Sequence, residues 1–113
     1  MNVVFHVSSG TLAEVRHATN NVRNLLGDET TETETVTLLA NGDSVYFFTA
    51  DSPIADSVES LVEVGVRVRV CRNSITGRDI DAGELVEGIE LVPSGVGEVV
   101  KRQAAGDAYV KVP

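Results

Sequence analysis

The 113-residue sequence has little cysteine, few cationic side chains and no long apolar run. Its single cysteine, Cys71, excludes an intrachain disulfide and a cysteine-rich zinc site. Nine lysines and arginines stand against 17 acidic residues, giving a net charge of −8, so the sequence lacks the basic surface that nucleic acid or an anionic membrane requires. No apolar run approaches the roughly 20 residues of a membrane-spanning helix. We therefore expect neither a nucleic-acid partner nor a membrane partner.

Two further absences concern cellular location and metal binding. Residues 1–5 lack the basic start and the small-residue cleavage site of an export signal. A lone thiol also suits a reducing compartment, so a cytoplasmic location is predicted. The two histidines, His6 and His17, do not have the spacing of metal ligands, and we expect no metal and no other cofactor.

What the chain does have is a regular alternation of strand-like and helical segments. Short runs of β-branched and other apolar residues indicate strands, and apolar residues at helical spacing indicate helices between them. Strands are expected over residues 3–7, 36–40, 66–71, 89–92 and 108–112, and helices over 11–27, 52–65 and 94–106, with a helical turn at 44–48 and a short helix after 81. This alternation predicts one α/β domain over residues 1–113, with a parallel sheet covered by helices on both faces.

Two segments of this assignment have particular consequences. The second helix is expected to begin at Ser52, whose hydroxyl would cap it, with Pro53 in its first turn. The apolar segment 45–48 is expected to pack in the core, with an interface patch between subunits as the alternative.

Function in an open parallel sheet is expected beyond the carboxyl ends of its strands. The loops at these ends are rich in small and hydrogen-bonding residues, which could hold an anionic ligand. The candidate ligand-binding residues are Asn41, Asp43, Arg69, Arg72, Asn73, Ser74, Ser94, Gly95 and Gly97.

Cys71 is the candidate with the clearest chemistry, because it ends the third predicted strand just before a polar loop. Arg69 and Arg72 would favour its thiolate by their charge, and a helix beginning after it would add the field of its N-terminus. Such a thiolate could attack a sulfur donor or carry a persulfide. The alternative is a buried cysteine that acts as a small apolar side chain. Reactivity would require the sulfur to be accessible and ionised.

Several other candidates have a structural alternative. Arg67 and Arg69 share one strand face and could border a subunit interface or an anion site, but pairing with helix carboxylates is favoured. The Ser-Gly-Val-Gly turn at 94–97 could bind an anion through its backbone N–H groups, but a tight turn that requires glycine is favoured. His6 is expected to be a hydrogen-bonded core residue rather than a base. Asp43 is expected to be a turn residue, although it could act as a general base beside Cys71.

Two sequence blocks together suggest a family. These are Gly-Val-Arg-Val-Arg-Val-Cys at 65–71 and Pro-Ser-Gly-Val-Gly-Glu at 93–98, preceded by Leu-Leu-Ala-Asn-Gly at 38–42. With them the chain resembles the DsrE/DsrF-like family, which includes the TusD-type sulfur-relay subunits. It is most similar to the short, single-domain and largely uncharacterised branch, and the resemblance covers nearly the whole chain.

The resemblance implies a three-layer α/β/α sandwich, with a five-stranded parallel sheet in the order 4-3-2-1-5. It also implies a homo-oligomer, either a trimer or a hexamer. In the sulfur-relay members a cysteine after the third strand accepts a persulfide and passes it on, and Cys71 matches that position. A sulfur donor or acceptor protein would then be the partner.

Two functions follow as expectations. The first is an intracellular persulfide carrier that uses Cys71, with sulfurtransferase-like activity. The second is a non-catalytic oligomeric module whose rim loops bind a small anionic metabolite or a nucleotide.

Overall fold

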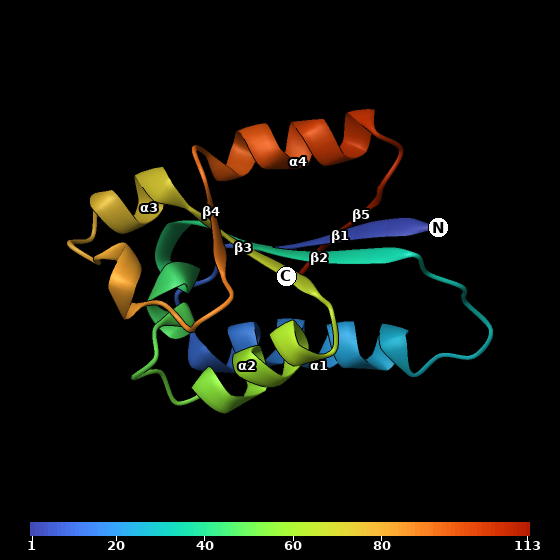
Figure 1. Cartoon of the computed structure of the whole chain (residues 1–113), viewed down its shortest axis with the longest axis horizontal. Helices are drawn as coiled ribbons and strands as arrows, with labels where there is room; N and C mark the ends of the chain where they lie inside the picture. The colour runs from blue at the N-terminus through green and yellow to red at the C-terminus, as the bar shows by residue number, and fades with distance from the viewer.

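Five parallel strands form the centre of the computed structural model, which describes all 113 residues (Figure 1). The strands are β1 (Asn2–Val7), β2 (Thr35–Ala40), β3 (Arg67–Cys71), β4 (Glu90–Val92) and β5 (Ala108–Lys111). They lie in the order β4-β3-β2-β1-β5, and every neighbouring pair is parallel. The predicted fold class and the strand order implied by the resemblance are both confirmed.

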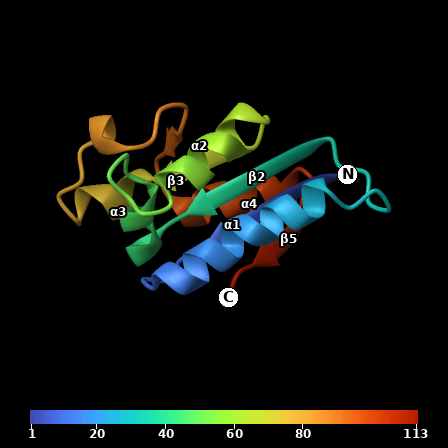
Figure 2. The same cartoon turned by 90° about the horizontal axis from the view of Figure 1, so that it is seen from below.

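Helices cover both faces of the sheet. Figure 1 shows α1 (Leu12–Leu26) and α2 (Ala55–Glu63) on one face and α4 (Gly95–Ala104) on the other. Figure 2, the view from below, shows α1 and α2 next to each other in front of the sheet. The short α3 (Arg72–Thr76) follows β3 directly, and the 3-10 helices η1 (Gly42–Phe48) and η2 (Ala82–Glu84) complete the chain. None of the helices has both the length and the apolar character needed to cross a membrane.

The start of α2 differs from the sequence expectation. The helix begins at Ala55, and its N-cap is Ile54, which makes no side-chain capping hydrogen bond. The Ser52 hydroxyl accepts a hydrogen bond from the N–H of Ile54 at 3.1 Å, so it closes a turn ahead of the helix instead of capping the helix itself. The prediction that Ser52 caps the helix is therefore wrong.

The two segments that flank the carboxyl end of the sheet are helical. The 44–48 segment forms part of η1, where Val45 and Phe48 are fully buried, which confirms the core packing favoured for it, while Tyr46 remains exposed. The assigned elements did not include α3, although a helix beginning after Cys71 was considered as a source of its field. It begins at Arg72, because Cys71 itself serves as its N-cap. The loop expected after the third strand is thus a turn of helix that starts at the cysteine.

The two faces of the sheet differ sharply in how apolar they are. The face under α1 and α2 carries a core cluster of 21 buried apolar residues. The face under α4 carries a cluster of only three, Val4, Leu39 and Val92, with Val99 of α4 packed against them. Because burial of apolar surface is the main force that docks a helix, α4 is held by less of it than α1 and α2 are. The polar side chains of the candidate site lie on the α4 face.

Candidate functional site

Cys71 lies at the carboxyl end of β3 on the face covered by α4. Strand alternation directs Val68 and Val70 into the larger core, and Arg69 and Cys71 to the opposite face. The sulfur caps α3, because Sγ accepts a hydrogen bond from the N–H of Ser74 at 3.4 Å. The sulfur therefore faces backbone donors that have no partner within the helix.

The thiol of Cys71 lies within a donor set made of the Ser74 hydroxyl and the backbone N–H groups of Gly95, Ser74 and Asn73. Burial raises the pKa of Cys71, but the hydrogen bonds from this donor set outweigh that effect and leave the pKa below its ordinary value. The Ser74 hydroxyl is itself held in place, since it accepts the N–H of Gly42 at 2.9 Å. Gly42 has φ +59°, a conformation that favours glycine.

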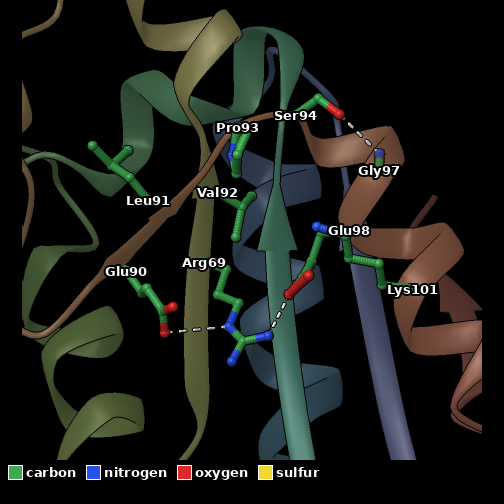
Figure 3. A pocket seen from close by; sticks show the side chains of 9 residues that line it. All are labelled: Arg69, Glu90, Leu91, Val92, Pro93, Ser94, Gly97, Glu98 and Lys101. Atoms are coloured by element: carbon green, nitrogen blue, oxygen red, sulfur yellow. Dashed lines mark hydrogen bonds and ion pairs between the residues drawn. The ribbon is translucent and has the colours of Figure 1, made fainter.

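The arginines next to Cys71 do not act as the sequence suggested. Arg69 pairs with Glu98 of α4 and lies 3.5 Å from Glu90, so its charge is compensated on the α4 face (Figure 3). Arg72 is exposed and forms no ion pair. The expectation that Arg69 and Arg72 lower the thiol pKa is wrong, because hydrogen bonds from the donor set lower it. The alternative favoured for Arg69, pairing with a helix carboxylate, is confirmed.

The sulfur of Cys71 is less accessible than a carrier in solution would require. The residue is a free cysteine with 5% of its surface exposed. Its burial is that expected of a cysteine that acts as a small apolar side chain, but the groups around its sulfur are polar hydrogen-bond donors and not hydrocarbon. The start of α4 covers it, because the Gly95 N–H is among the groups that reach the sulfur.

A second group of polar side chains lies on the same face, across β2 and β1. His6 is half-buried, with Nε2 2.7 Å from Asn41 Oδ1 and Nδ1 2.7 Å from the hydroxyl oxygen of Tyr109. Burial lowers the pKa of His6, the Asn41 hydrogen bond opposes this, and the nearby charge of Lys111 lowers it further. The net result is a pKa below the ordinary 6.5, which favours a neutral imidazole. The expectation that His6 is hydrogen-bonded is confirmed, but the residue is half-buried and does not belong to either apolar core cluster.

Asn41 connects this second group to the start of α4. The pairing of Ala40 with Val70 places Asn41, which directly follows β2, beside Cys71 at the same edge of the sheet. A Cβ added to Gly95 would lie 2.9 Å from the Asn41 Cβ and 3.1 Å from its Nδ2, so only glycine fits there without movement. Gly95 is required for this close approach and not for an unusual φ. Ser94 caps α4 by accepting the Gly97 N–H at 2.9 Å.

A cavity of about 240 Å³ lies between β4 and the first turns of α4. Figure 3 shows Arg69 and Glu98 pointing toward each other, with Ser94 at the start of α4 and Gly97 and Lys101 along it. Its charged side chains are two cations and two anions, Arg69, Lys101, Glu90 and Glu98. Cys71 does not line the cavity, so Arg69, Ser94 and Gly97 form a group apart from the donor set.

The remaining candidate residues point elsewhere. Asp43 is exposed, and its Oδ1 accepts hydrogen bonds from Arg78 at 2.8 and 3.0 Å, so it is tied to α3's far end and not placed as a base for the thiol. Asn73 is exposed and reaches the sulfur only through its backbone N–H. No group of three or more histidine, cysteine or acidic side chains is arranged to hold a metal ion. Tyr109 was not among the candidates, because only the pairing of β5 beside β1 brings it to His6.

Comparison with known proteins supports the same fold. The model of the DsrE/DsrF-like family matches residues 1–112. The solved structure of MTH1491 from Methanobacterium thermoautotrophicum, described as a protein of unknown function, is 34% identical, with a TM-score of 0.91 and 97% of each chain covered. YchN from E. coli is 19% identical with a TM-score of 0.71, over 98% of this chain and 99% of its own. BT1422 from Bacteroides thetaiotaomicron is 11% identical with a TM-score of 0.77, over 98% and 94%, so these two show the fold alone. No curated protein matches the chain.

Proposed function

From the premise that the chain belongs to the DsrE/DsrF-like family, we propose that it is a persulfide carrier in which Cys71 holds the sulfur. The observation that supports this role is the donor set around the sulfur, which favours the thiolate without any charged partner. The thiolate is the nucleophile in sulfur transfer, so a site that stabilises it prepares the residue for that reaction.

The proposed reaction exchanges one sulfur–sulfur bond for another. The Cys71 thiolate attacks the terminal sulfur of a donor persulfide, and a new bond forms between Sγ and that sulfur. The donor's sulfur–sulfur bond breaks, and its electron pair leaves on the donor thiolate. The proton on the transferred sulfur stays with it, so no oxidant or reductant is consumed. An acceptor thiolate then attacks the terminal sulfur of the Cys71 persulfide in the same kind of step, and Cys71 leaves as the thiolate.

The donor set has a distinct task in this reaction. Before transfer it stabilises the anion on Sγ, and after transfer, once the transferred sulfur has released its proton to water, it stabilises the negative charge of the deprotonated persulfide. With 5% of Cys71 exposed, entry of a donor requires the first turn of α4 to move. That movement exposes less apolar surface than movement of α1 or α2 would, because only a three-residue apolar cluster lies beneath α4, and it also separates Glu98 of the first turn from Arg69.

The test is to incubate the protein with a small persulfide donor, alkylate it and measure its intact mass. We expect the wild-type chain to gain one sulfur and the Cys71→Ser variant to gain none. Because Cys71 is the chain's one cysteine, no other thiol can produce the signal. A wild-type chain that takes up no sulfur, or a gain that persists in Cys71→Ser, contradicts the proposal.

We also infer that the carrier is a homo-oligomer, a trimer or a hexamer. Supporting this are Val96 and Val100, which are four residues apart on α4 and are 67% and 60% exposed. Native mass spectrometry should give a trimer or hexamer for the wild type, and a Val96→Asp/Val100→Asp variant should give a folded monomer. A monomeric wild type contradicts the inference.

A second candidate function is a module that binds a small anionic metabolite. The cavity favours it through Lys101, which lines it and forms no ion pair, although about 240 Å³ is below the roughly 300 Å³ at which ligand pockets usually begin, so a nucleotide is the less suitable occupant. A thermal-shift panel of small anions should then raise the melting temperature equally in the wild type and in Cys71→Ser. No stabilisation by any of them removes this candidate.

A further inference from the structure

The persulfide reaction leaves one part of the site without a role, the hydrogen-bonded chain from Tyr109 through His6 to Asn41. The three residues come from β5, β1 and the end of β2, and both contacts of the imidazole measure 2.7 Å. Asn41 then meets Gly95, whose N–H belongs to the donor set. The chain thus runs from the edge of the sheet to the sulfur's immediate neighbours.

The protons in this chain can be assigned from chemistry. Asn41 Oδ1 only accepts hydrogen bonds, so His6 Nε2 must carry the proton in their contact. A neutral imidazole then has a lone pair on Nδ1, and the Tyr109 hydroxyl donates to it. Every bond points the same way, from Tyr109 to His6 to Asn41. Because the Asn41 oxygen faces His6, its NH₂ group faces Gly95.

We propose that His6 and Tyr109 are positioning residues that hold the Asn41 side chain with its NH₂ group toward Gly95, beside the donor set of Cys71, where the positive end of the amide dipole favours the charge carried by the thiolate or persulfide. This assignment rests on the proposed function for its purpose. If the amide were reversed, its carbonyl oxygen would lie beside the donor set, and the site would gain a dipole that repels the anion. The Nε2–H tautomer of His6 opposes the reversal, because it offers a donor where only the oxygen can accept.

The first experiment reads the protonation of His6 directly. Long-range ¹H–¹⁵N NMR distinguishes the two neutral tautomers of histidine in the folded wild-type protein. We expect the Nε2–H tautomer for His6, and a mixture of tautomers in Tyr109→Phe, where Nδ1 no longer receives a proton donor. An Nδ1–H tautomer in the wild type overturns the proposal, because Asn41 would then have to turn its NH₂ group toward His6.

The second experiment follows the rate of Cys71 alkylation against pH, which gives the apparent thiol pKa. Asn41→Asp replaces the NH₂ group by a charged oxygen of the same size, and we expect the apparent pKa to rise by about one pH unit. His6→Gln keeps an N–H donor near the Nε2 position and should retain the wild-type value. His6→Asn reaches only the Nδ1 position and should raise the pKa.

The chain offers a matched control in a second histidine–asparagine pair. His17 and Asn21 lie on the exposed surface of α1, with Nε2 and Nδ2 3.3 Å apart. Asn21→Asp adds the same charge on the other side of the sheet and should leave the alkylation profile unchanged. The proposal is overturned if Asn41→Asp behaves like Asn21→Asp, or if folded His6→Asn and Tyr109→Phe both keep the wild-type profile.

These readouts separate the inference from the function it rests on. Alkylation and NMR report on the resting thiol, so shifted profiles in a protein that takes up no sulfur would support the positioning chain and refute the carrier. Sulfur uptake together with unshifted alkylation profiles would support the carrier and refute the positioning chain. Should His6→Asn fail to fold, Tyr109→Phe still decides the matter, because it removes one hydroxyl from a residue that is 38% exposed.

Discussion

The N–H of Ser74 points at the sulfur of Cys71 from 3.4 Å, so the strand that carries the cysteine and the helix that follows it meet at the thiol. The same serine accepts the N–H of Gly42 through its hydroxyl oxygen, which leaves the hydroxyl proton for the sulfur. Hydrogen-bond donors of the local chain thus lower the thiol pKa, whereas the charge of a neighbouring arginine was expected from the sequence to do so.

Replacing Ser74 by alanine should weaken this arrangement in two ways. The Cys71 thiol loses one donor, so its apparent pKa should rise by about half a unit to one unit. The Gly42 N–H also loses its acceptor, which should cost about 1–3 kcal/mol of unfolding free energy. Alkylation against pH and urea unfolding measure the two effects. Ser57→Ala on α2, on the opposite face of the sheet, is the control and should change neither.

Gly95→Ala should disturb the site through Asn41. The new Cβ would lie 2.9 Å from the Asn41 Cβ, so either α4 or the asparagine must move, at a cost of about 1–3 kcal/mol. The movement carries the Gly95 N–H away from the sulfur and should raise the thiol pKa. Gly83→Ala, where a Cβ meets nothing within 4 Å, should unfold at the wild-type urea concentration. Equal stabilities for the two variants would contradict the close packing at Gly95.

The ion pair of Arg69 and Glu98 should be costly to break from one side. Both side chains are largely buried, at 15% and 7% exposure, so Glu98→Ala leaves a charge without its partner and should cost about 3–5 kcal/mol. Replacing both residues, as in Arg69→Met/Glu98→Leu, should recover most of the loss. Asp43→Asn breaks the more exposed pair with Arg78 and should cost at most about 1 kcal/mol. Urea unfolding of the wild type and of these three variants tests the expectations.

Stability should depend on pH through His6. Its pKa in the folded state is below the ordinary 6.5, so the unfolded chain binds a proton more readily than the folded one. The stabilising contribution of neutral His6 is therefore complete above 6.5 and declines as the pH falls through that value. His6→Gln should lose less stability than the wild type between about pH 7 and about pH 5. Parallel curves for the two proteins would show that His6 titrates alike in both states.

The architecture could be predicted because it depends on patterns within short segments. Alternating valines in the third strand and regularly spaced apolar residues in the helices indicate the elements, and their strict alternation indicates a parallel sheet. The start of the second helix was misplaced because a hydroxyl before a proline suits a turn as well as a cap. The helix after Cys71 was considered but not assigned, because a five-residue segment is too short for its periodicity to be recognised.

The candidate site was only partly predictable, since its contacts join distant segments. Cys71, Asn41, Ser74 and Gly95 were identified as rim residues, but their sequence positions do not show which of them meet. The charge of Arg69 was expected to act on Cys71, but in the fold Arg69 pairs with Glu98, which is 29 positions away in the sequence. Tyr109 reaches His6 across 103 positions and has no local signal that marks it.

The most direct test of the account is the thiol pKa of Cys71 in the wild-type protein, measured from the rate of alkylation as a function of pH. The donor set predicts a midpoint clearly below the ordinary value of 9.0, together with sulfur uptake by the same residue. A midpoint at or above 9.0 would mean that burial outweighs the hydrogen bonds, and that Cys71 is a structural residue in this fold.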